Sequence, residues 1–248
     1  MPQTVLLTGA SGYIAKHIVL PLLEAGVSRV ILASSTVAIS GSQLPPGDKA
    51  FDETNWTDPS DPDVSPYARS KTLAEQAAWD FLRNEAPEMQ LTVVNPGFVL
   101  GAPLDRHFGT SVAAIERLLR GKDPMLADIG FATVDVKDVA EMHVTAIIAP
   151  ETVGQGIMTI DRFMSFAEIA QAIKSACPDR KIPVRVAPGC VIRSLGLFDP
   201  AIKSIVPALG RVDKMDNGRA VAHFGRGMRR AHRAAVSTGT YLIENKLV

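Results

Sequence analysis

The sequence has few cysteines, no excess of either charge and no long apolar run. Its 248 residues include only Cys177 and Cys190, which are too few for a disulfide framework and lack the spacing of a zinc site. We therefore expect a reducing, cytoplasmic location. Basic and acidic residues both number 26, so no net charge draws the chain to nucleic acid or to an anionic membrane.

Signals for membranes and metals are also missing. No apolar run approaches the ~20 residues needed to span a bilayer. No basic segment precedes the first apolar run, so we expect no secretory signal. The histidines lack ligand spacing such as H-E-x-x-H, so we expect no metal site. They are His17, His107, His143, His223 and His232.

An arginine-rich segment near the C-terminus could bind phosphate or nucleic acid. Because the chain is neutral overall, a solvated helix face is the favoured interpretation. Its members are Arg219, Arg226, Arg229, Arg230 and Arg233.

The remaining sequence alternates between short β-rich runs and amphipathic helical segments, which predicts a mostly parallel sheet covered by helices on both faces. The expected strands are 4–8, 29–33, 91–95, a run ending near 135, and 156–160. The expected helices are 14–23, one beginning at Ser65-Pro66, 111–120, one from about 136, and 165–176. Leu73, Ala77 and Phe81 should form the apolar face of the second helix. Residues 43–66 read as a long irregular loop, and the tail from residue 199 as part of a smaller lobe.

The segment "TGASGYIA" places Gly9, Gly12 and Ala15 between the first strand and the first helix. A turn without side chains lets backbone N–H groups approach a pyrophosphate, and the following helix N-terminus favours its negative charge. The same pattern also occurs in tight strand–helix turns that bind nothing. Its position after a strand and before a helix favours a dinucleotide site.

A second group of residues carries acid–base chemistry. In "SPYARSK", Tyr67 and Lys71 are one helical turn apart and share a face. An ammonium beside a phenol favours the phenolate, which makes the phenol a useful proton donor or acceptor. Ser35 at a strand end could hydrogen-bond a reacting oxygen, with Ser34 or Thr36 as competing choices. Y-x-x-x-K alone is weak, but the order of glycine turn, serine strand and tyrosine helix is specific.

In this order the chain resembles the extended short-chain dehydrogenase/reductases, also described as the NAD-dependent epimerase/dehydratase family. Within them it is most similar to dihydroflavonol-reductase-like aldehyde and ketone reductases. The segments that carry the resemblance are "VLLTGASGYIAKHIV", "SRVILASSTVAI", "FDETNWTD", "YARSKTLAEQAAWDFL", "LTVVNPGFVLGAP" and "FATVDVKDVAEMHV". The resemblance implies a Rossmann-like α/β fold with a small C-terminal substrate lobe. We expect the shortened NAD(P)-binding region at 1–150 and the C-terminal part at 151–248.

The resemblance also implies roles for residues. Tyr67 would donate a proton to a carbonyl oxygen, Lys71 would hold the nicotinamide ribose, and Ser35 would bind the carbonyl oxygen. The residues expected around NADP or NAD are Gly9, Ser11, Gly12, Tyr13, Ile14, Ser34, Tyr67, Lys71, Pro96, Gly97 and Val99. The stretch "NPGF" could equally be only a strand-ending turn.

The chain departs from this family directly after Gly26. A loss of about three βα units, ~30 residues each, fits the short path from the first helix to the serine strand. The residue that would choose between NAD and NADP lies in the missing part. So does a strand expected between the first strand and the serine strand, and the sheet must then close up or expose unpaired edges. A helix that would help form a dimer is also lost, so we expect a monomer or a homodimer.

Three functions remain open from the sequence. The first is hydride transfer between NAD(P)H and a small aldehyde or ketone, with Tyr67 as proton donor. The second is a nucleotide-sugar epimerase or dehydratase. The third is a catalytically weak or inactive remnant that lacks the adenosine-binding half.

Overall fold

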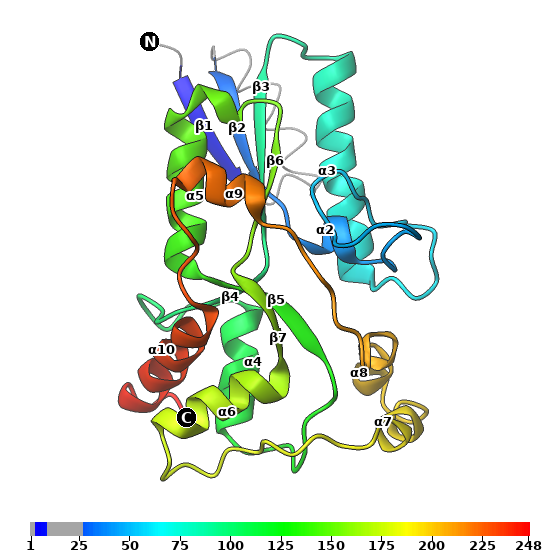
Figure 1. Cartoon of the computed structure of the whole chain (residues 1–248), viewed down its shortest axis with the longest axis vertical. Helices are drawn as coiled ribbons and strands as arrows, with labels where there is room; N and C mark the ends of the chain where they lie inside the picture. The colour runs from blue at the N-terminus through cyan, green and yellow to red at the C-terminus, as the bar shows by residue number, and fades with distance from the viewer. Residues whose placement is uncertain (1–2, 9–26) are drawn as a thin grey trace. The chain divides into compact units, whose positions relative to one another are not determined.

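The computed structural model describes residues 3–8 and 27–248, and these form two compact units that are treated separately below (Figure 1). The first unit contains residues 1–97, 138–159 and 215–227, and the second contains 98–137, 160–214 and 228–248. The predicted division at residue 150 stays a prediction. The predicted glycine turn (Gly9, Ser11, Gly12, Tyr13, Ile14) and the helix after it lie outside the described residues.

A four-stranded parallel sheet organises the first unit. Its strands are β1 (Gln3–Thr8), β2 (Val27–Ala33), β3 (Gln90–Pro96) and β6 (Gly156–Thr159), in the order β1-β2-β3-β6. Helix α3 (Pro66–Asn84) and helix α5 (Val136–Ile148) flank this sheet on opposite sides (Figure 1). Parallel strands joined through flanking helices are Rossmann-like, as the sequence predicted.

No strand lies between β1 and β2, where the resemblance predicts one in full-length relatives. β1 pairs directly and in parallel with β2, with Leu6 opposite Ile31. β2 pairs in turn with β3, where Ile31 lies opposite Thr92. β2 and β3 are buried along almost their whole length, and their buried positions include the polar side chains Arg29, Thr92 and Asn95. A sheet without that interior strand was expected either to close up or to expose unpaired edges. In this unit the two strands pair directly, so the sheet closes up.

Helix α3 begins where the sequence predicted and packs differently. The Ser65 hydroxyl accepts a hydrogen bond from the Ala68 N–H at 3.1 Å, and Pro66 occupies the first helical position. The prediction that Leu73 belongs to the buried face was wrong, because this side chain is 50% exposed. The buried residues of the helix are Ala68, Thr72 and Glu75, so its inner face is partly polar.

Short elements complete the first unit. Helix α2 (Val37–Ser40) follows β2, and helix α9 (Gly218–Phe224) packs on β6. A 3₁₀ turn (Pro150–Thr152) follows α5. Within the predicted loop 43–66, Phe51 is buried and pairs with Met215 through an isolated bridge. The loop is therefore anchored to the segment that leads into α9.

The second unit has its own small sheet, which the sequence did not predict. β4 (Phe98–Leu100) runs parallel to β5 (Gly130–Asp135), and β7 (Arg162–Ser165) runs antiparallel to β5. Its helices are α4 (Thr110–Leu119), α6 (Phe166–Ala176), α7 (Gly189–Leu195), α8 (Pro200–Lys203) and α10 (Ala231–Glu244), with a 3₁₀ turn at Val206–Ala208. The core lies where α4, α6 and α10 meet β4, and includes Leu100, Ile115 and Ile173. As predicted, Ser165 caps α6, here in a capping box with Glu168.

No described helix is both long and apolar enough to cross a membrane. In the same part of the chain, no three potential ligands gather as a metal site would require.

Candidate functional site

The carboxyl ends of β2 and β3 bring several of the predicted site residues together. The segment that follows β2 stays paired with β3. The Ser34 N–H bonds to the Val94 carbonyl at 2.8 Å, and the Thr36 N–H bonds to the Pro96 carbonyl at 3.0 Å. The Gly97 N–H bonds to the last residue of β6 at 3.3 Å. Ser34, Pro96 and Gly97 therefore lie at one edge of the parallel sheet. Open α/β sheets bind their ligands at this edge.

Ser35 is buried at the point where β2 turns into α2. Its hydroxyl oxygen accepts a 3.4 Å hydrogen bond from the Val37 N–H, and its carbonyl accepts one from the Ala38 N–H at 3.0 Å. Helix α2 packs against α3, which carries the predicted tyrosine and lysine. The serine is thus held by backbone contacts beside the tyrosine helix.

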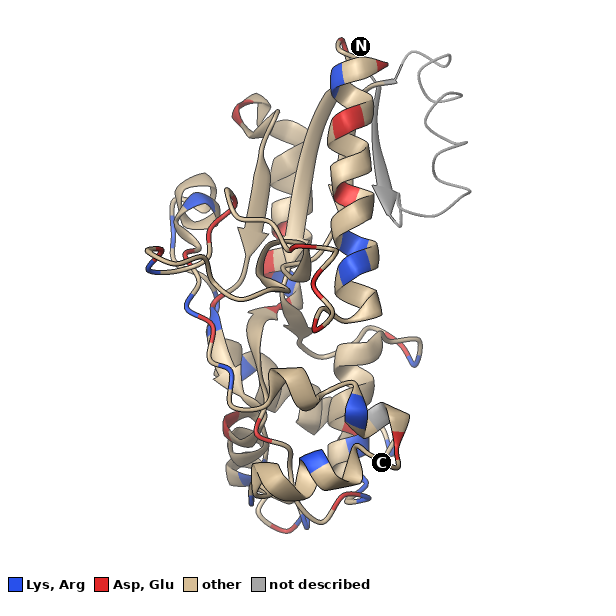
Figure 2. Cartoon of the chain, turned by 90° about the vertical axis from the view of Figure 1, so that its right-hand side faces the viewer, with Lys and Arg blue, Asp and Glu red and all other residues tan. Residues whose placement is uncertain are grey.

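Tyr67 and Lys71 lie in the first two turns of α3. The Tyr67 side chain is 57% exposed, and Lys71 is half-buried. Among the described residues, no hydrogen bond joins either side chain to Ser35. The Tyr67 side chain is therefore largely open to solvent. Charges of both signs follow one another along this helix (Figure 2).

Two residues that sequence reasoning missed connect these parts. Glu75 lies one turn beyond Lys71 and is 4% exposed. Asn95 is the residue before the last of β3 and is fully buried. The Asn95 amide donates to the Glu75 carboxyl at 2.7 Å and, more weakly, to the Ser35 carbonyl at 3.4 Å. Through this amide, α3 is joined to the end of the serine strand. Two features of the sequence could have pointed to these residues. One is an acidic residue on the buried face of a helix, and the other is an asparagine directly before Pro-Gly.

The surroundings of Glu75 act on its pKa in opposite directions, and the net effect is to raise it. Burial raises the pKa of this carboxyl, while hydrogen bonds from Ser34, Asn95 and Trp79 and the charge of Lys71 act in the opposite direction. The Trp79 indole N–H lies 3.5 Å from one carboxyl oxygen. The Ser34 hydroxyl is near enough to influence the carboxyl, but makes no hydrogen bond of good geometry within the described chain. Asn95 Oδ1 is likewise buried and unpartnered there.

The predicted Val99 belongs to β4 of the second unit, whereas the other described members of the predicted site belong to the first. It is half-buried. With the glycine turn outside the described residues, the site visible in the first unit consists of Ser34, Ser35, Tyr67 and Lys71 with the Pro96-Gly97 turn. These are the residues that the family resemblance predicts beside the nicotinamide and the substrate carbonyl.

The loop before the tyrosine helix is fixed by specific polar contacts. A Glu53 carboxyl oxygen accepts from the Met158 N–H of β6 at 2.9 Å. Arg219 on α9 reaches Glu53 at 3.8 Å and the Gly156 carbonyl at 2.7 Å. Residues 51–53 are thus held against the sheet just upstream of α3.

The prediction that the arginine-rich segment is a solvated face is wrong for two members. Arg219 makes the contacts just described. Arg226 donates to Asp138, which is fully buried, at 2.9 Å and to Glu141 at 2.7 Å. Its guanidinium also lies over the Phe224 ring, 4.6 Å from the centroid. Both arginines connect distant segments of the first unit.

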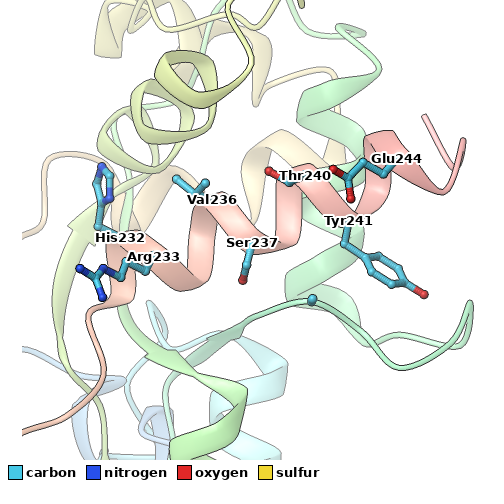
Figure 3. Close-up of a pocket in the computed structure, with 8 residues that line it drawn as sticks. His232, Arg233, Val236, Ser237, Thr240, Tyr241 and Glu244 are labelled. Atoms are coloured by element: carbon cyan, nitrogen blue, oxygen red, sulfur yellow. The ribbon is translucent and has the colours of Figure 1, made fainter.

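The second unit has an open hollow of about 550 Å³ along one face of α10 (Figure 3). Its lining consists of Ala102, His232, Arg233, Val236, Ser237, Thr240, Tyr241 and Glu244. The Tyr241 hydroxyl lies 3.4 Å from the Asp105 carbonyl. None of the predicted site residues lines this hollow.

Comparison with known proteins agrees with the fold and the residue order. Residues 22–160, more than half of the chain, match the model of the family described as "NAD dependent epimerase/dehydratase family". The chain belongs to this family. The resemblance read from the sequence is therefore confirmed, within a branch that includes cinnamoyl-CoA and anthocyanidin reductases.

Its relatives include reductases from fungi. The chain is 36% identical over 169 residues to the ketoreductase azaE of Aspergillus niger, covering 62% of this chain and 48% of that protein. It is 30% identical over 176 residues to the NADPH-dependent methylglyoxal reductase GRE2 of Saccharomyces cerevisiae, covering 64% and 51%. The chain spans about half the length of these relatives.

Solved structures show the same fold. The NADPH complex of Gre2 from Candida albicans superimposes with a TM-score of 0.73 at 22% sequence identity, covering 97% of this chain and 76% of that one. At this identity the likeness establishes the Rossmann-like architecture.

Proposed function

We propose that this protein is an NAD(P)H-dependent reductase of small aldehydes or ketones. The observation that carries the proposal is the pair of Asn95 hydrogen bonds that connects α3 to the segment after β2 at the sheet edge. Ser35 is buried at the end of β2, and Asn95 links its carbonyl to α3, which exposes Tyr67 and carries Lys71 one turn later. A hydroxyl, a phenol and an ammonium beside the carboxyl ends of parallel strands are suited to carbonyl reduction.

The described residues fit the reactive end of a nicotinamide cofactor. Ser34 offers a buried hydroxyl without a partner of good geometry in the described chain, and the Pro96-Gly97 turn lies beside it. Lys71 would hold the ribose next to the ring, and Gly9, Ser11, Gly12, Tyr13 and Ile14 would approach the pyrophosphate. When bound, the cofactor supplies the hydride. NADPH is the form to test first, because a relative is named as NADPH-dependent and a related structure was solved with NADPH.

The residues of the chain would then divide the proton chemistry. Ser35 would donate a hydrogen bond to the substrate oxygen and stabilise the negative charge that develops there. Tyr67 would transfer its phenolic proton to that oxygen. Lys71 would stabilise the phenolate left on Tyr67 until a proton returns from solvent.

The test combines cofactor binding with turnover. We expect saturable binding of NADPH or NADH, followed by fluorescence, and oxidation of the bound cofactor by members of a panel of small aldehydes and ketones. Tyr67→Phe should retain cofactor affinity within about threefold and lose at least about 10²-fold in kcat, as expected for removal of a general acid. Turnover unaffected by this substitution would contradict the assignment of Tyr67.

A second candidate is a remnant without catalytic activity. Direct pairing of β1 with β2, and a match that spans only about half the length of the relatives, favour this candidate. Absence of saturable binding by either cofactor would support it and reject the reductase. The nucleotide-sugar epimerase or dehydratase alternative is separated in the same assay by replacing the carbonyl panel with nucleotide sugars.

A further inference from the structure

The outer edge of β6 carries backbone groups that its own sheet does not use. Among the described strands, β6 is the last of this sheet and pairs with β3 on one side only. The Gln155 carbonyl, directly before β6, accepts a hydrogen bond from the Val93 N–H of β3 at 2.9 Å and so faces β3. Because successive residues of a strand turn their backbone groups to opposite sides, the Gly156 carbonyl and the Met158 N–H face away from β3. Free backbone groups at a sheet edge are a template for pairing with another strand.

Two charged side chains bind these outward-facing groups. Glu53 Oε1 accepts from the Met158 N–H at 2.9 Å, and Arg219 Nη1 donates to the Gly156 carbonyl at 2.7 Å. The two side chains also face each other, with 3.8 Å between Arg219 Nε and Glu53 Oε2, and the Glu53 side chain is only 6% exposed. In a parallel sheet, one residue of a neighbouring strand would bond to the same two groups through its own C=O and N–H. The ion pair therefore reproduces the hydrogen bonds of one residue of a further strand.

Two segments that are distant in sequence bring this pair to the edge. Phe51 and Met215 form an isolated parallel bridge, and the Asp216 N–H donates to the Phe51 carbonyl at 2.8 Å. Glu53 follows the bridge on one segment, and Arg219 follows it on the other, in helix α9, which packs on β6 (Figure 1). Neither segment adds a strand to the described sheet. The edge is thus covered by side chains where another strand would otherwise fit.

We infer that Glu53 and Arg219 take the place of a neighbouring strand along β6 and thereby keep this edge from pairing with a second copy of the chain. Exposed strand edges recruit extended segments through main-chain hydrogen bonds. A second copy is the partner that fits, because two identical edges can pair with each other about a two-fold axis. Such pairing must displace both charged groups and leave a nearly buried carboxylate without its N–H donor, which is costly. The inference does not depend on the reductase function.

Sedimentation velocity over a range of protein concentrations tests this inference. The double variant Glu53→Ala/Arg219→Ala frees both backbone groups, and its self-association constant should exceed that of the parent by about tenfold or more. Glu53→Gln keeps an oxygen acceptor for the Met158 N–H and should associate no more than the parent. Asp80→Ala/Arg83→Ala is the matched control, because it removes an exposed ion pair of α3 and likewise leaves the net charge unchanged. This control should also behave as the parent does.

Hydrogen exchange locates the contact between the copies. In the double variant at low concentration, the Met158 amide should exchange faster than in the parent, and it should become protected again at concentrations where the variant associates. A folded double variant that associates no more than the parent would overturn the inference and leave the pair as an anchor of residues 51–53. Association without renewed protection of β6 would place the contact elsewhere and would also overturn it. Where the double variant does not fold, Glu53→Ala alone, which frees only the Met158 N–H, is put to the same two measurements.

Discussion

Arg226 closes over Asp138, with its Nη2 atom 2.9 Å from a carboxyl oxygen of a fully buried side chain. The arginine follows α9 and the aspartate lies in the first turn of α5, so one guanidinium joins segments 88 residues apart in sequence. Glu141, one turn later, is the second acceptor at 2.7 Å. The ion pairs hold the segment 215–227 to α5, another part of the first unit.

Replacement of Arg226 should therefore destabilise this unit. Arg226→Met removes this guanidinium from the buried Asp138, and we expect a loss of about 1–3 kcal/mol in the free energy of unfolding, measured by urea denaturation. Arg83→Met is the control, because Arg83 pairs with Asp80 on the exposed surface of α3, where ion pairs contribute about 0–1 kcal/mol. Equal effects of the two substitutions would contradict a structural role for the Arg226 contact.

Glu75 should make stability depend on pH in a definite direction. Because burial raises the pKa of Glu75 in the folded state above its ordinary value of 4.5, the folded chain binds this proton more tightly than the unfolded chain. Its contribution is complete below 4.5 and is lost as pH rises through the folded pKa. The stability of Glu75→Gln relative to the parent should therefore increase with pH above 4.5.

The quantity to measure is the difference in the free energy of unfolding between Glu75→Gln and the parent. Carboxyls with lowered pKa, such as Asp52 and Asp123, are common to both proteins. Their opposite pH dependence then cancels. Urea denaturation at several pH values from 4 to 8 gives the difference. A difference that stays constant over this range would show that the Glu75 pKa is not raised.

Removal of the Ser35 hydroxyl should affect the reaction and spare the fold. The hydroxyl accepts one long hydrogen bond from the Val37 N–H, so Ser35→Ala removes little structure. Loss of one donor to a developing oxyanion lowers kcat by about 10²–10³-fold. Ser60→Ala, at an exposed turn in the same unit, should have no effect. Retention of full kcat by Ser35→Ala would transfer the role to Ser34 or Thr36, the competing hydroxyls.

The sequence predicted those features that local patterns encode. Ser65 before Pro66 and Ser165 before a helical repeat predicted both caps, and short β-rich runs predicted β2 and β3. The error at Leu73 arose because periodicity marks an apolar stripe but not which stripe a helix buries. Here Glu75 is turned inward by contacts to Asn95, twenty residues away. β4 and β7 were missed because strands of three and four residues are too short for a clear alternation.

The site shows the same division between local and distant information. Tyr67 and Lys71 could be found because their spacing on one helix is visible in the sequence. The Asn95 link and the Arg226–Asp138 pair depend on how remote segments pack, which a single sequence does not encode locally. The family resemblance supplied the serine strand and the glycine turn together, because their order along the chain is characteristic even where their contacts are not.

The close approach of α10 and α6 in the second unit gives a last prediction. A Cβ atom at Gly239 of α10 would lie 2.5 Å from Cγ2 and 3.2 Å from Cγ1 of Ile173, a fully buried residue of α6. Alanine improves helix propensity by about 1 kcal/mol over glycine. Overpacking costs about 1–3 kcal/mol, and the β-branched Ile173 has little rotamer freedom to move away. Gly239→Ala should therefore destabilise the unit, whereas Thr240→Ala on the same helix should be neutral or slightly stabilising.

A double-mutant cycle tests this explanation directly. Ile173→Ala removes the atoms that an alanine at 239 would strike, although it creates a cavity of its own. In that background Gly239→Ala should no longer destabilise, because only the gain in helix propensity remains. The coupling between the two sites, measured by urea denaturation, should be about 1–3 kcal/mol. Additive effects of Gly239→Ala and Ile173→Ala would contradict this explanation. They would mean that the two helices move apart without cost and that the contact with Ile173 does not require glycine at position 239.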